Sequence, residues 1–261
     1  IRDDCSSRGH GDVYKRQPEV NIAWFLPNGD WPDSPTFQFR KLNPNSQESE
    51  ISRIINLNGY TYDRISRNNL LSSTVSEDRL NIGSASYQAL LINDLDHSSP
   101  SIIKKVLELA EAGILVIYVG NLPGRSTGLN DFLKKDNEIK KYSKKLLPMI
   151  NHMETPNGLT DSLKKADIHP LISILNKRED YFRSSVRSCG VYKVIYMFND
   201  SASASKKDFF LDKVFRDIKL LDPYDASIKE FYYLENGQNI NINIGPGRSK
   251  ILLLGRKENQ N

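Results

Sequence analysis

The feature that most constrains the fold is an apolar run with no polar side chain on either face. Residues 114–119 read Ile-Leu-Val-Ile-Tyr-Val, and a strand can be apolar on both faces only where it is covered on both sides, as in the centre of a parallel sheet. A segment of helical period precedes this run, beginning at Ser99-Pro100 and ending at Gly113. A helix followed by a buried strand is the repeating unit of a parallel α/β sheet.

The same alternation of strands and helices extends over residues 18–150. Strands are expected at 20–26, 60–65 and 87–92, with a short strand or hairpin arm at 79–82. Helices are expected after Ser46, after Ser99 and over 134–147. This half of the chain is therefore expected to form a doubly wound parallel sheet.

Residues 151–169 are rich in helix breakers, and we expect them to form a linker. After them the pattern of apolar and polar residues changes. From 170 to 257 the chain has short strand-like runs separated by turn signals such as Asn236-Gly237. The clearest run, 238–244, alternates isoleucine with asparagine, which predicts one buried and one solvated face. Seven or eight such strands predict an antiparallel β-sandwich.

The first seventeen residues do not read as part of the fold. Residues 12–17 (Asp-Val-Tyr-Lys-Arg-Gln) can be encoded by GAT GTG TAT AAG AGA CAG, a transposon end used in sequencing libraries. We therefore interpret 1–17 as translated adapter and expect it to pack against nothing. Without it, Cys189 is the single cysteine, which predicts an incidental thiol, no intrachain disulfide and no thiolate metal cluster.

Composition argues against several classes of protein. With 38% hydrophobic residues, the chain has enough apolar material for one large or two ordinary packed domains. No apolar run approaches the roughly 18 to 20 residues that a membrane span requires. The net charge of +4 is scattered, with no basic block interleaved with aromatic residues. We therefore expect neither a membrane nor a nucleic acid as partner.

Candidate binding residues follow two of the expected strands, at the edge of a doubly wound sheet where ligands bind. Asp30 and Trp31 follow the first strand, and an indole beside carboxylates can stack on a sugar ring and accept hydrogen bonds from its hydroxyls. Asp94, Asp96 and His97 follow the strand at 87–92 and offer groups for a cation or a polar ligand. The alternative is structural: Trp31 packs on the core, and the aspartates form turns and cap the next helix.

A third loop at this edge, Gly120 to Ser126, is glycine-rich but has neither the Walker spacing with its lysine nor a GxGxxG motif. No cofactor is predicted. Class I glutamine amidotransferases need a nucleophilic cysteine at the turn after an equivalent strand, and no cysteine lies between 18 and 188. No catalytic or metal-ligating residue is predicted in this chain, and the lysines of 134–147 are expected to form a solvated helix face.

Several segments, in order, resemble one family of large glycoside hydrolases, the α-L-rhamnosidases of family 106 and their relatives. They are NGYTYDRISRNNLL (58–71), YQALLINDLDHSSPSIIKKVLELAEAGILVIYVG (87–120), LPGRSTGLNDFLKKDNEIKK (122–141), YKVIYMFNDSASASKKDFFL (192–211), IKLLDPYDASIKEF (218–231) and IGPGRSKILLLGRK (244–257). The fifth is similar to a W-D-P-x-T-G-x-I turn. Here Leu221 stands in place of the tryptophan, and Asp225-Ala226 in place of Thr-Gly.

The resemblance implies an amidotransferase-like (flavodoxin-like) α/β domain without its nucleophile, followed by a β-sandwich. Together they would form the non-catalytic C-terminal portion of a polysaccharide-degrading enzyme. The implied partners are an upstream catalytic barrel of the same polypeptide and, through the full-length enzyme, an oligo- or polysaccharide. The acid/base carboxylates of such enzymes would lie on that barrel, before Pro18. A periplasmic or extracellular location is implied by the same resemblance.

The sequence leaves two other functions open. One is a stand-alone carbohydrate-binding module that uses Trp31 and exposed tyrosines such as Tyr232 and Tyr233. The other is a small-molecule enzyme on a flavodoxin-like domain, against which the missing cofactor motifs and the missing cysteine argue.

Overall fold

The computed structural model describes residues 20–25, 47–93, 95–171, 173–175, 182–189, 192–211, 215–231 and 238–256. Residues 1–17, interpreted above as adapter, lie outside this set. The chain divides into two compact units. The first, here called the α/β unit, comprises 20–54 and 62–169. The second, called the β unit, comprises 55–61 and the residues from 170 onward.

The α/β unit contains a five-stranded sheet in the order β10-β8-β6-β1-β2, and all neighbouring strands are parallel. Its strands are β1 (Ile22–Phe25), β2 (Tyr62–Ile65), β6 (Ala89–Asn93), β8 (Leu115–Val119) and β10 (Asn151–Met153). Every residue of β1 and β6 is buried. The prediction of a parallel α/β sheet is therefore confirmed.

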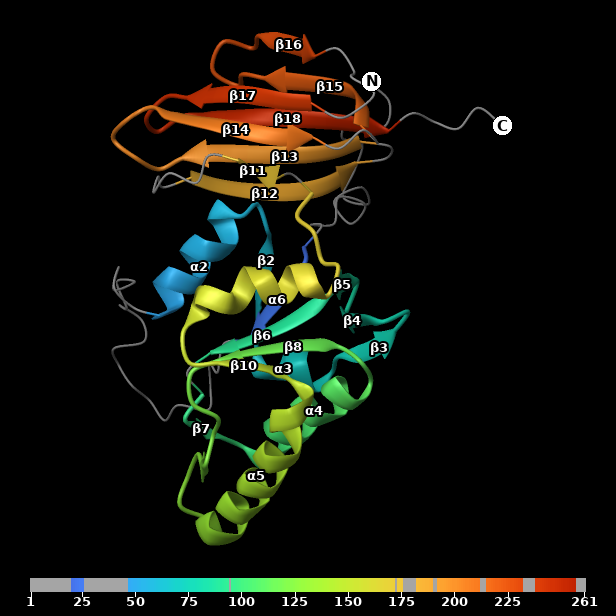
Figure 1. Ribbon diagram of the computed structural model, residues 1–261, viewed down its shortest axis with the longest axis vertical. Coiled ribbons are helices and arrows are strands. Elements are labelled where there is room, and N and C mark those ends of the chain that lie inside the picture. Colours follow the sequence, from blue (N-terminus) through green and yellow to red (C-terminus); the bar gives the residue numbers. More distant parts are fainter. Residues whose placement is uncertain are drawn as a thin grey trace. The chain divides into compact units, whose positions relative to one another are not determined.

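Helices lie on both sides of this sheet (Figure 1). They are α2 (Gln47–Leu57), α3 (Arg67–Leu71), α4 (Pro100–Glu111), α5 (Phe132–Leu146) and α6 (Leu159–Lys165), with 3₁₀ helices η3 (Leu147–Met149) and η4 (Pro156–Gly158). The side chains of Ala23 and Phe25 belong to the same buried cluster as Ile103 of α4 and Ile139 of α5. Because side chains alternate along a strand, Ile22 and Trp24 lie on the opposite face.

Three helices end in the same way, because a residue with positive φ follows each of them. Gly113 has a φ of 89°, and the next residue, Ile114, donates its N–H to the carbonyl of Leu109 at 3.1 Å. Gly59 ends α2 in the same pattern, and after α6 the position is taken by Asp167 with a φ of 57°. This hydrogen bonding satisfies the last carbonyls of a helix and turns the chain back.

A small antiparallel sheet and a two-stranded bridge complete the α/β unit. The sheet has the order β3-β4-β5, with β3 (Thr74–Ser76), β4 (Arg79–Ile82) and β5 (Ala85–Tyr87), and the bridge pairs β7 (His97–Ser98) with β9 (Arg125–Ser126). Glu77 and Asp78 turn the chain from β3 to β4 with φ values of 52° and 55°. Positive φ at both central residues defines the type I′ turn that suits a two-residue hairpin.

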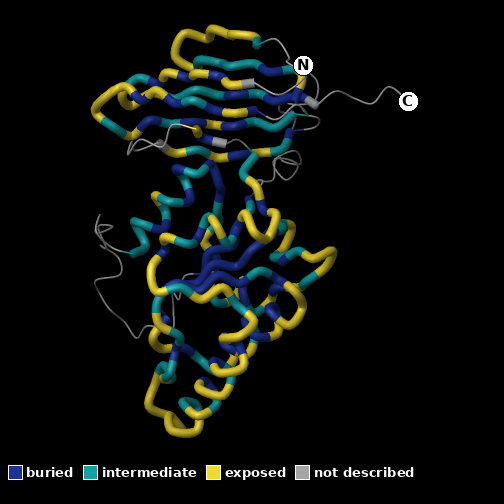
Figure 2. The backbone as a smooth tube through the Cα atoms, in the orientation of Figure 1, coloured by how far each residue is buried: buried dark blue, intermediate teal, exposed yellow. Residues whose placement is uncertain are grey.

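The β unit consists of two antiparallel sheets, ordered β12-β13-β18-β15-β16 and β11-β14-β17. The strands are β11 (Ser173–Ile174), β12 (Phe182–Cys189), β13 (Tyr192–Asn199), β14 (Ser205–Leu211), β15 (Phe215–Leu221), β16 (Ile228–Phe231), β17 (Gln238–Ile244) and β18 (Ser249–Arg256). Side chains from both sheets form one core cluster. Figure 2 shows buried positions along the strands of this unit. In β17 the three isoleucines are buried, as the alternation with asparagine predicts.

One glycine lets two strands that are not neighbours bind each other. Tyr192 of β13 donates its hydroxyl to Asp217 of β15 at 2.8 Å, across β18, which lies between them. A Cβ on Gly255 of β18 would lie 2.8 Å from the Tyr192 ring. The missing side chain therefore leaves the space in which the ring crosses the strand.

A single buried asparagine joins two turns of the β unit. Asn199, at the end of β13, donates its side-chain amide to the carbonyls of Ser203 at 2.7 Å and of Ile244 at 3.0 Å. Its side-chain oxygen accepts hydrogen bonds from the backbone N–H and the hydroxyl of Ser201. Its backbone exchanges hydrogen bonds with Gly247 and Arg248. The turn after β13 and the turn after β17 therefore share one buried polar centre.

Four observations differ from the expectations. The chain bends at Gln88 between β5 and β6, where a single strand was predicted, because Gln88 and Ala89 both donate their N–H groups to the carbonyl of Asn21. A strand was expected to begin at Asp208, but β14 begins at Ser205, because it pairs with the whole of β17. Residues 151–169, predicted to be a linker, contain β10, which pairs with β8 in the parallel sheet. Cys189 is disulfide-bonded, so the prediction of an incidental thiol without a disulfide is wrong.

Replacing Asn199 with alanine should lower the free energy of unfolding by about 1–3 kcal/mol, because the buried carbonyl of Ile244 loses this donor and water cannot replace it. Urea denaturation of the purified chain measures this. The matched control is Asn241→Ala in β17, an exposed asparagine whose side chain hydrogen-bonds Asp208; it should cost less than about 1 kcal/mol. Equal losses in the two variants would contradict the central role of Asn199.

Candidate functional site

The carboxyl ends of the central strands lie side by side at one edge of the parallel sheet. Phe25 is in register with Ile92, and Asn93 is in register with Val119. The loops that follow β1, β6 and β8 therefore all start at this edge, where open α/β sheets bind ligands. Of the predicted site residues, Asp30, Trp31 and Asp94 lie outside the described residues.

Asp96 and His97 are both exposed at this edge. The residue before them, Leu95, is buried, and its carbonyl accepts a hydrogen bond from the hydroxyl of Tyr118 at 3.2 Å. His97 is in register with Arg125 in the β7–β9 bridge, so the loops after β6 and β8 are joined. The N-cap of α4 is Ser99, which leaves the carboxylate of Asp96 outside the helix cap.

The glycine-rich loop after β8 already uses backbone N–H groups that a phosphate would need. Gly120 donates its N–H to the carbonyl of Met153 at 2.9 Å, and Ser126 donates its N–H to a carboxylate oxygen of Asp136 at 2.6 Å. Hydrogen bonding by Ser126 holds the pKa of Asp136 below its ordinary value. Because phosphate loops bind through free backbone N–H groups, these two bonds argue against phosphate binding here.

One buried polar pair at the sheet edge escaped sequence reasoning. Trp24 is fully buried in β1, and its indole N–H donates to the side-chain oxygen of Asn93 at 2.7 Å. The edge of Tyr62 lies against the indole, with ring centroids 4.9 Å apart, and the guanidinium of Arg64 lies 5.3 Å from the indole centroid. A buried indole N–H needs an acceptor. An asparagine that ends an apolar strand was the signal that could have revealed the pair.

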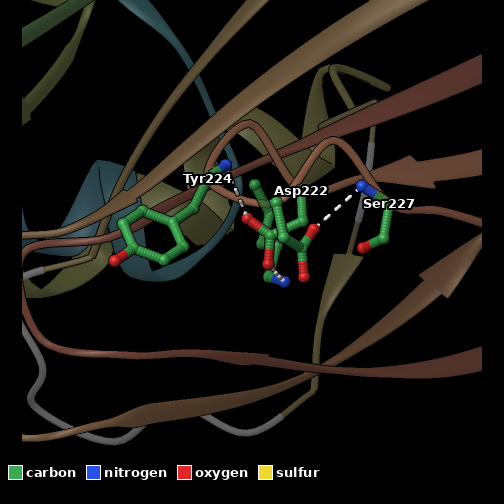
Figure 3. A network of polar contacts seen from close by, with 5 residues as sticks. Asp222, Tyr224 and Ser227 are labelled. Atoms are coloured by element: carbon green, nitrogen blue, oxygen red, sulfur yellow. Dashed lines mark hydrogen bonds and ion pairs between the residues drawn. The ribbon is translucent and has the colours of Figure 1, made fainter.

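A second polar network lies in the β unit, in the turn between β15 and β16 (Figure 3). Asp222 accepts the N–H of Tyr224 at 3.0 Å and forms an ion pair with Lys250 of β18. Asp225 accepts the N–H of Ser227 at 2.8 Å, and Asp222 donates its own N–H to the carbonyl of Ser227. These contacts fix the backbone of the turn.

The same turn displays one large aromatic side chain. Tyr224 is 76% exposed, and the guanidinium of Arg248 stacks on its ring, 3.4 Å from the ring centroid. Ala226 has a φ of 57°, which places an alanine in the left-handed region at the position where the rhamnosidase-like turn pattern has glycine. The site thus combines a strained backbone with an oriented, exposed tyrosine.

The two carboxylates of this turn are unsuited to general acid catalysis. The Lys250 hydrogen bond and the Tyr224 N–H hold the pKa of Asp222 below its ordinary value, and hydrogen bonding by Ser227 does the same for Asp225. A glycosidase acid needs the opposite shift, because it must be protonated when it meets the substrate. Both aspartates therefore serve the structure of the turn.

The described residues offer no other obvious chemical centre. No group of three or more His, Cys, Asp or Glu side chains in the described ranges is placed to hold a metal ion. In the same part of the chain, no helix has the length and apolar character needed to span a bilayer.

The sequence matches no protein-family model and no curated protein sequence. Solved structures do resemble it. A rhamnosidase from Novosphingobium sp. PP1Y is similar with a TM-score of 0.67 and 14% identity over 94% of this chain and 23% of that chain. A β-galactosidase from Bacillus circulans sp. alkalophilus gives a TM-score of 0.56 at 9% identity, over 93% of this chain and 42% of that one. A β-galactosidase from the psychrophilic Marinomonas ef1 gives 0.51 at 9% identity, over 91% and 38%.

These similar structures are glycoside hydrolases, and at such identities the likeness is one of fold. The chain spans less than a quarter of the rhamnosidase and less than half of each galactosidase. In each case nearly all of this chain corresponds to a part of a longer polypeptide.

Ala226→Gly should raise the free energy of unfolding by about 0.5–1 kcal/mol, because glycine adopts a left-handed φ without the strain that a Cβ causes. Thermal and urea unfolding measure the change. The control is Ala204→Gly in the turn between β13 and β14, an exposed alanine that does not have a positive φ; there the variant should be no more stable than the parent. Destabilisation by Ala226→Gly would contradict the strain.

In the variant Asp222→Asn, the free energy of unfolding should decrease less on acidification than it does in the parent. The pKa of Asp222 lies below its ordinary value of 3.8 in the folded chain. Its stabilising contribution is therefore present above the unfolded pKa and is lost as the pH falls through the folded pKa, in a window below about pH 4.

Urea unfolding from neutral pH down to about pH 3 measures this slope. The variant should be less stable than the parent at neutral pH and should lose less on acidification. Asp96→Asn, in which an exposed carboxylate is removed from the other unit, is the control. Parallel pH profiles of the parent and Asp222→Asn would refute the assignment.

Proposed function

We propose that this chain is the non-catalytic C-terminal portion of a glycoside hydrolase that resembles the α-L-rhamnosidases of family 106. In this proposal it supports an upstream catalytic barrel and lines one side of the sugar site. The observation that carries the proposal is the alignment of 94% of the chain, both units together, with 23% of a rhamnosidase at a TM-score of 0.67. A coincidental likeness of one common domain would have covered one unit only.

The strand order supports the finer assignment of the α/β unit. Numbered along the chain, the five parallel strands stand in the order 2-1-3-4-5, which is the flavodoxin-like order of doubly wound sheets. The turn after β8 carries Gly120, where an amidotransferase would need its nucleophile, so the domain we propose is amidotransferase-like in fold alone. The shared core of the two antiparallel sheets supports a β-sandwich for the second unit.

The proposed sugar contacts are the loops at the carboxyl edge of the parallel sheet. Asp30, Trp31, Asp94, Asp96 and His97 remain the proposed residues. The exposure of Asp96 and His97 and the β7–β9 pairing beside them support a polar surface at this edge. Trp31 would supply the stacking face and the other four the hydrogen bonds.

A second candidate, a stand-alone carbohydrate-binding module, has one observation in its favour. The ring of Tyr224 is exposed and held in place by Arg248, and rigid exposed aromatics are suited to stacking on sugar rings. Tyr232 and Tyr233, suggested by the sequence for the same role, lie outside the described residues. Binding of oligosaccharides by the isolated chain, lost in Tyr224→Ala, would favour this candidate.

The purified chain should release no aglycone from aryl α-L-rhamnosides, whereas the polypeptide extended through its upstream coding sequence should release it. The reason is that glycosidases need two carboxyl groups held across the scissile bond, and the aspartates of the β15–β16 turn have lowered pKa values. Chromogenic release at matched molar concentrations measures both. Turnover by the isolated chain that disappears in Asp96→Asn or Asp225→Asn would overturn the proposal.

A further inference from the structure

Three large apolar side chains are exposed to solvent close together at the start of α5. Leu129 is 90% exposed, Phe132 46% and Leu133 68%, and we call these three residues the apolar tip. All residues from 128 to 134 are exposed, and Figure 2 shows them as an unbroken exposed stretch. Isolated exposed leucines are ordinary, but three large apolar side chains within five residues are typical of a contact surface.

The backbone holds the apolar tip in a defined shape. Gly128 has a φ of 113° and Asp131 a φ of 52°, so two residues with positive φ flank the pair Leu129-Asn130. Lys135 donates its backbone N–H to the carbonyl of Asp131 and its ammonium group to the carbonyl of Asn130, at 3.0 and 2.7 Å. A non-glycine residue held in the left-handed region costs energy, and such strain is concentrated at binding sites.

The inner side of α5 is packed against its own unit through other residues. The exposure of the apolar tip therefore does not result from an unpacked helix. Ile139 and Leu146 are fully buried, and Ser143 donates its hydroxyl to the carbonyl of Pro123 at 2.9 Å. These contacts fix the inner side of the helix against its own unit. Leu133 is left on the outer side.

The helix that continues from the apolar tip is lysine-rich, whereas the tip itself includes one exposed carboxylate, Asp131. The helix α5 carries six lysines against two acidic residues, Asp136 and Glu138, and the carboxylate of Asp136 accepts the N–H of Ser126. Lys134, Lys140, Lys141, Lys144 and Lys145 are exposed. A partner that fits this surface needs an apolar recess bordered by acidic side chains.

We infer that the apolar tip is the surface through which the α/β unit docks on the upstream portion of the same polypeptide. The inference rests on the proposed function and names the contact that it requires. A second copy of this chain is disfavoured because two lysine-rich helices would repel each other. The lengths favour a partner within the same polypeptide, since the similar folds occur within polypeptides more than twice as long as the matched part, and the proposed function places that partner upstream.

Hydrogen exchange of the intact long polypeptide, compared with this chain expressed alone, tests the inference. Amides of 129–135 should exchange at least about ten-fold more slowly in the intact polypeptide, because docking removes them from solvent. The double variant Leu129→Asp/Leu133→Asp, made in the intact polypeptide, should lose this protection. The matched control is Leu175→Asp in the β unit, where an exposed leucine is replaced and the protection should remain.

The failures of the inference and of the proposed function can be told apart. Protection elsewhere in this chain but not at 129–135 would overturn the docking surface and leave the proposed function standing. Protection nowhere in this chain would overturn both.

Two measurements on the isolated chain test other occupants of the apolar tip. Dimerisation in sedimentation that Leu133→Asp abolishes would replace the upstream portion by a second copy. Binding to vesicles of phosphatidylcholine and phosphatidylglycerol in equal parts, lost in the same variant, would replace it by a lipid surface.

Discussion

The constraint on which the α/β unit depends is that parallel strands cannot be joined by tight turns. Each strand must be followed by a crossover that returns the chain to the amino edge, so the loops after β1, β6 and β8 all leave from one edge. The strands must also be buried on both faces, which leaves Trp24 without water for its indole N–H. Asn93 supplies the acceptor at 2.7 Å. The edge from which these loops leave therefore also contains a buried polar pair that fixes their starting points.

Sequence reasoning was most successful where pattern and local chemistry agree. Helix α4 was predicted from Ser99-Pro100 to Gly113, and β17 from its alternating isoleucines, because each has both a period and a terminating residue. Tertiary pairing decided the rest. Lys207 is fully buried in β14, so the inward face of that strand does not read as apolar and its start was placed three residues late. The partnership of Trp24 with Asn93 joins residues 69 positions apart, and no local pattern contains it.

The location of the candidate site could be predicted from the sequence better than the residues that form it. The carboxyl edge follows from the parallel topology, and Asp96 and His97 are exposed there. The turn between β15 and β16 was recognised only as part of a family pattern. Its character depends on Lys250 and Arg248, which approach from another strand and its preceding turn. Lys250 lowers the pKa of Asp222, and Arg248 stacks on the ring of Tyr224. Distance in sequence concealed both contacts.

The buried amide of Asn199 has a consequence for how this fold can vary in evolution. Because one side chain binds carbonyls at 203 and 244, the chain between 199 and 203 and the chain between 244 and 248 must keep their lengths together. An insertion in either turn would carry an acceptor out of reach and leave the amide buried without it. Length variation among related chains is then confined to other connections, and these two turns mark fixed points from which diverged sequences can be aligned.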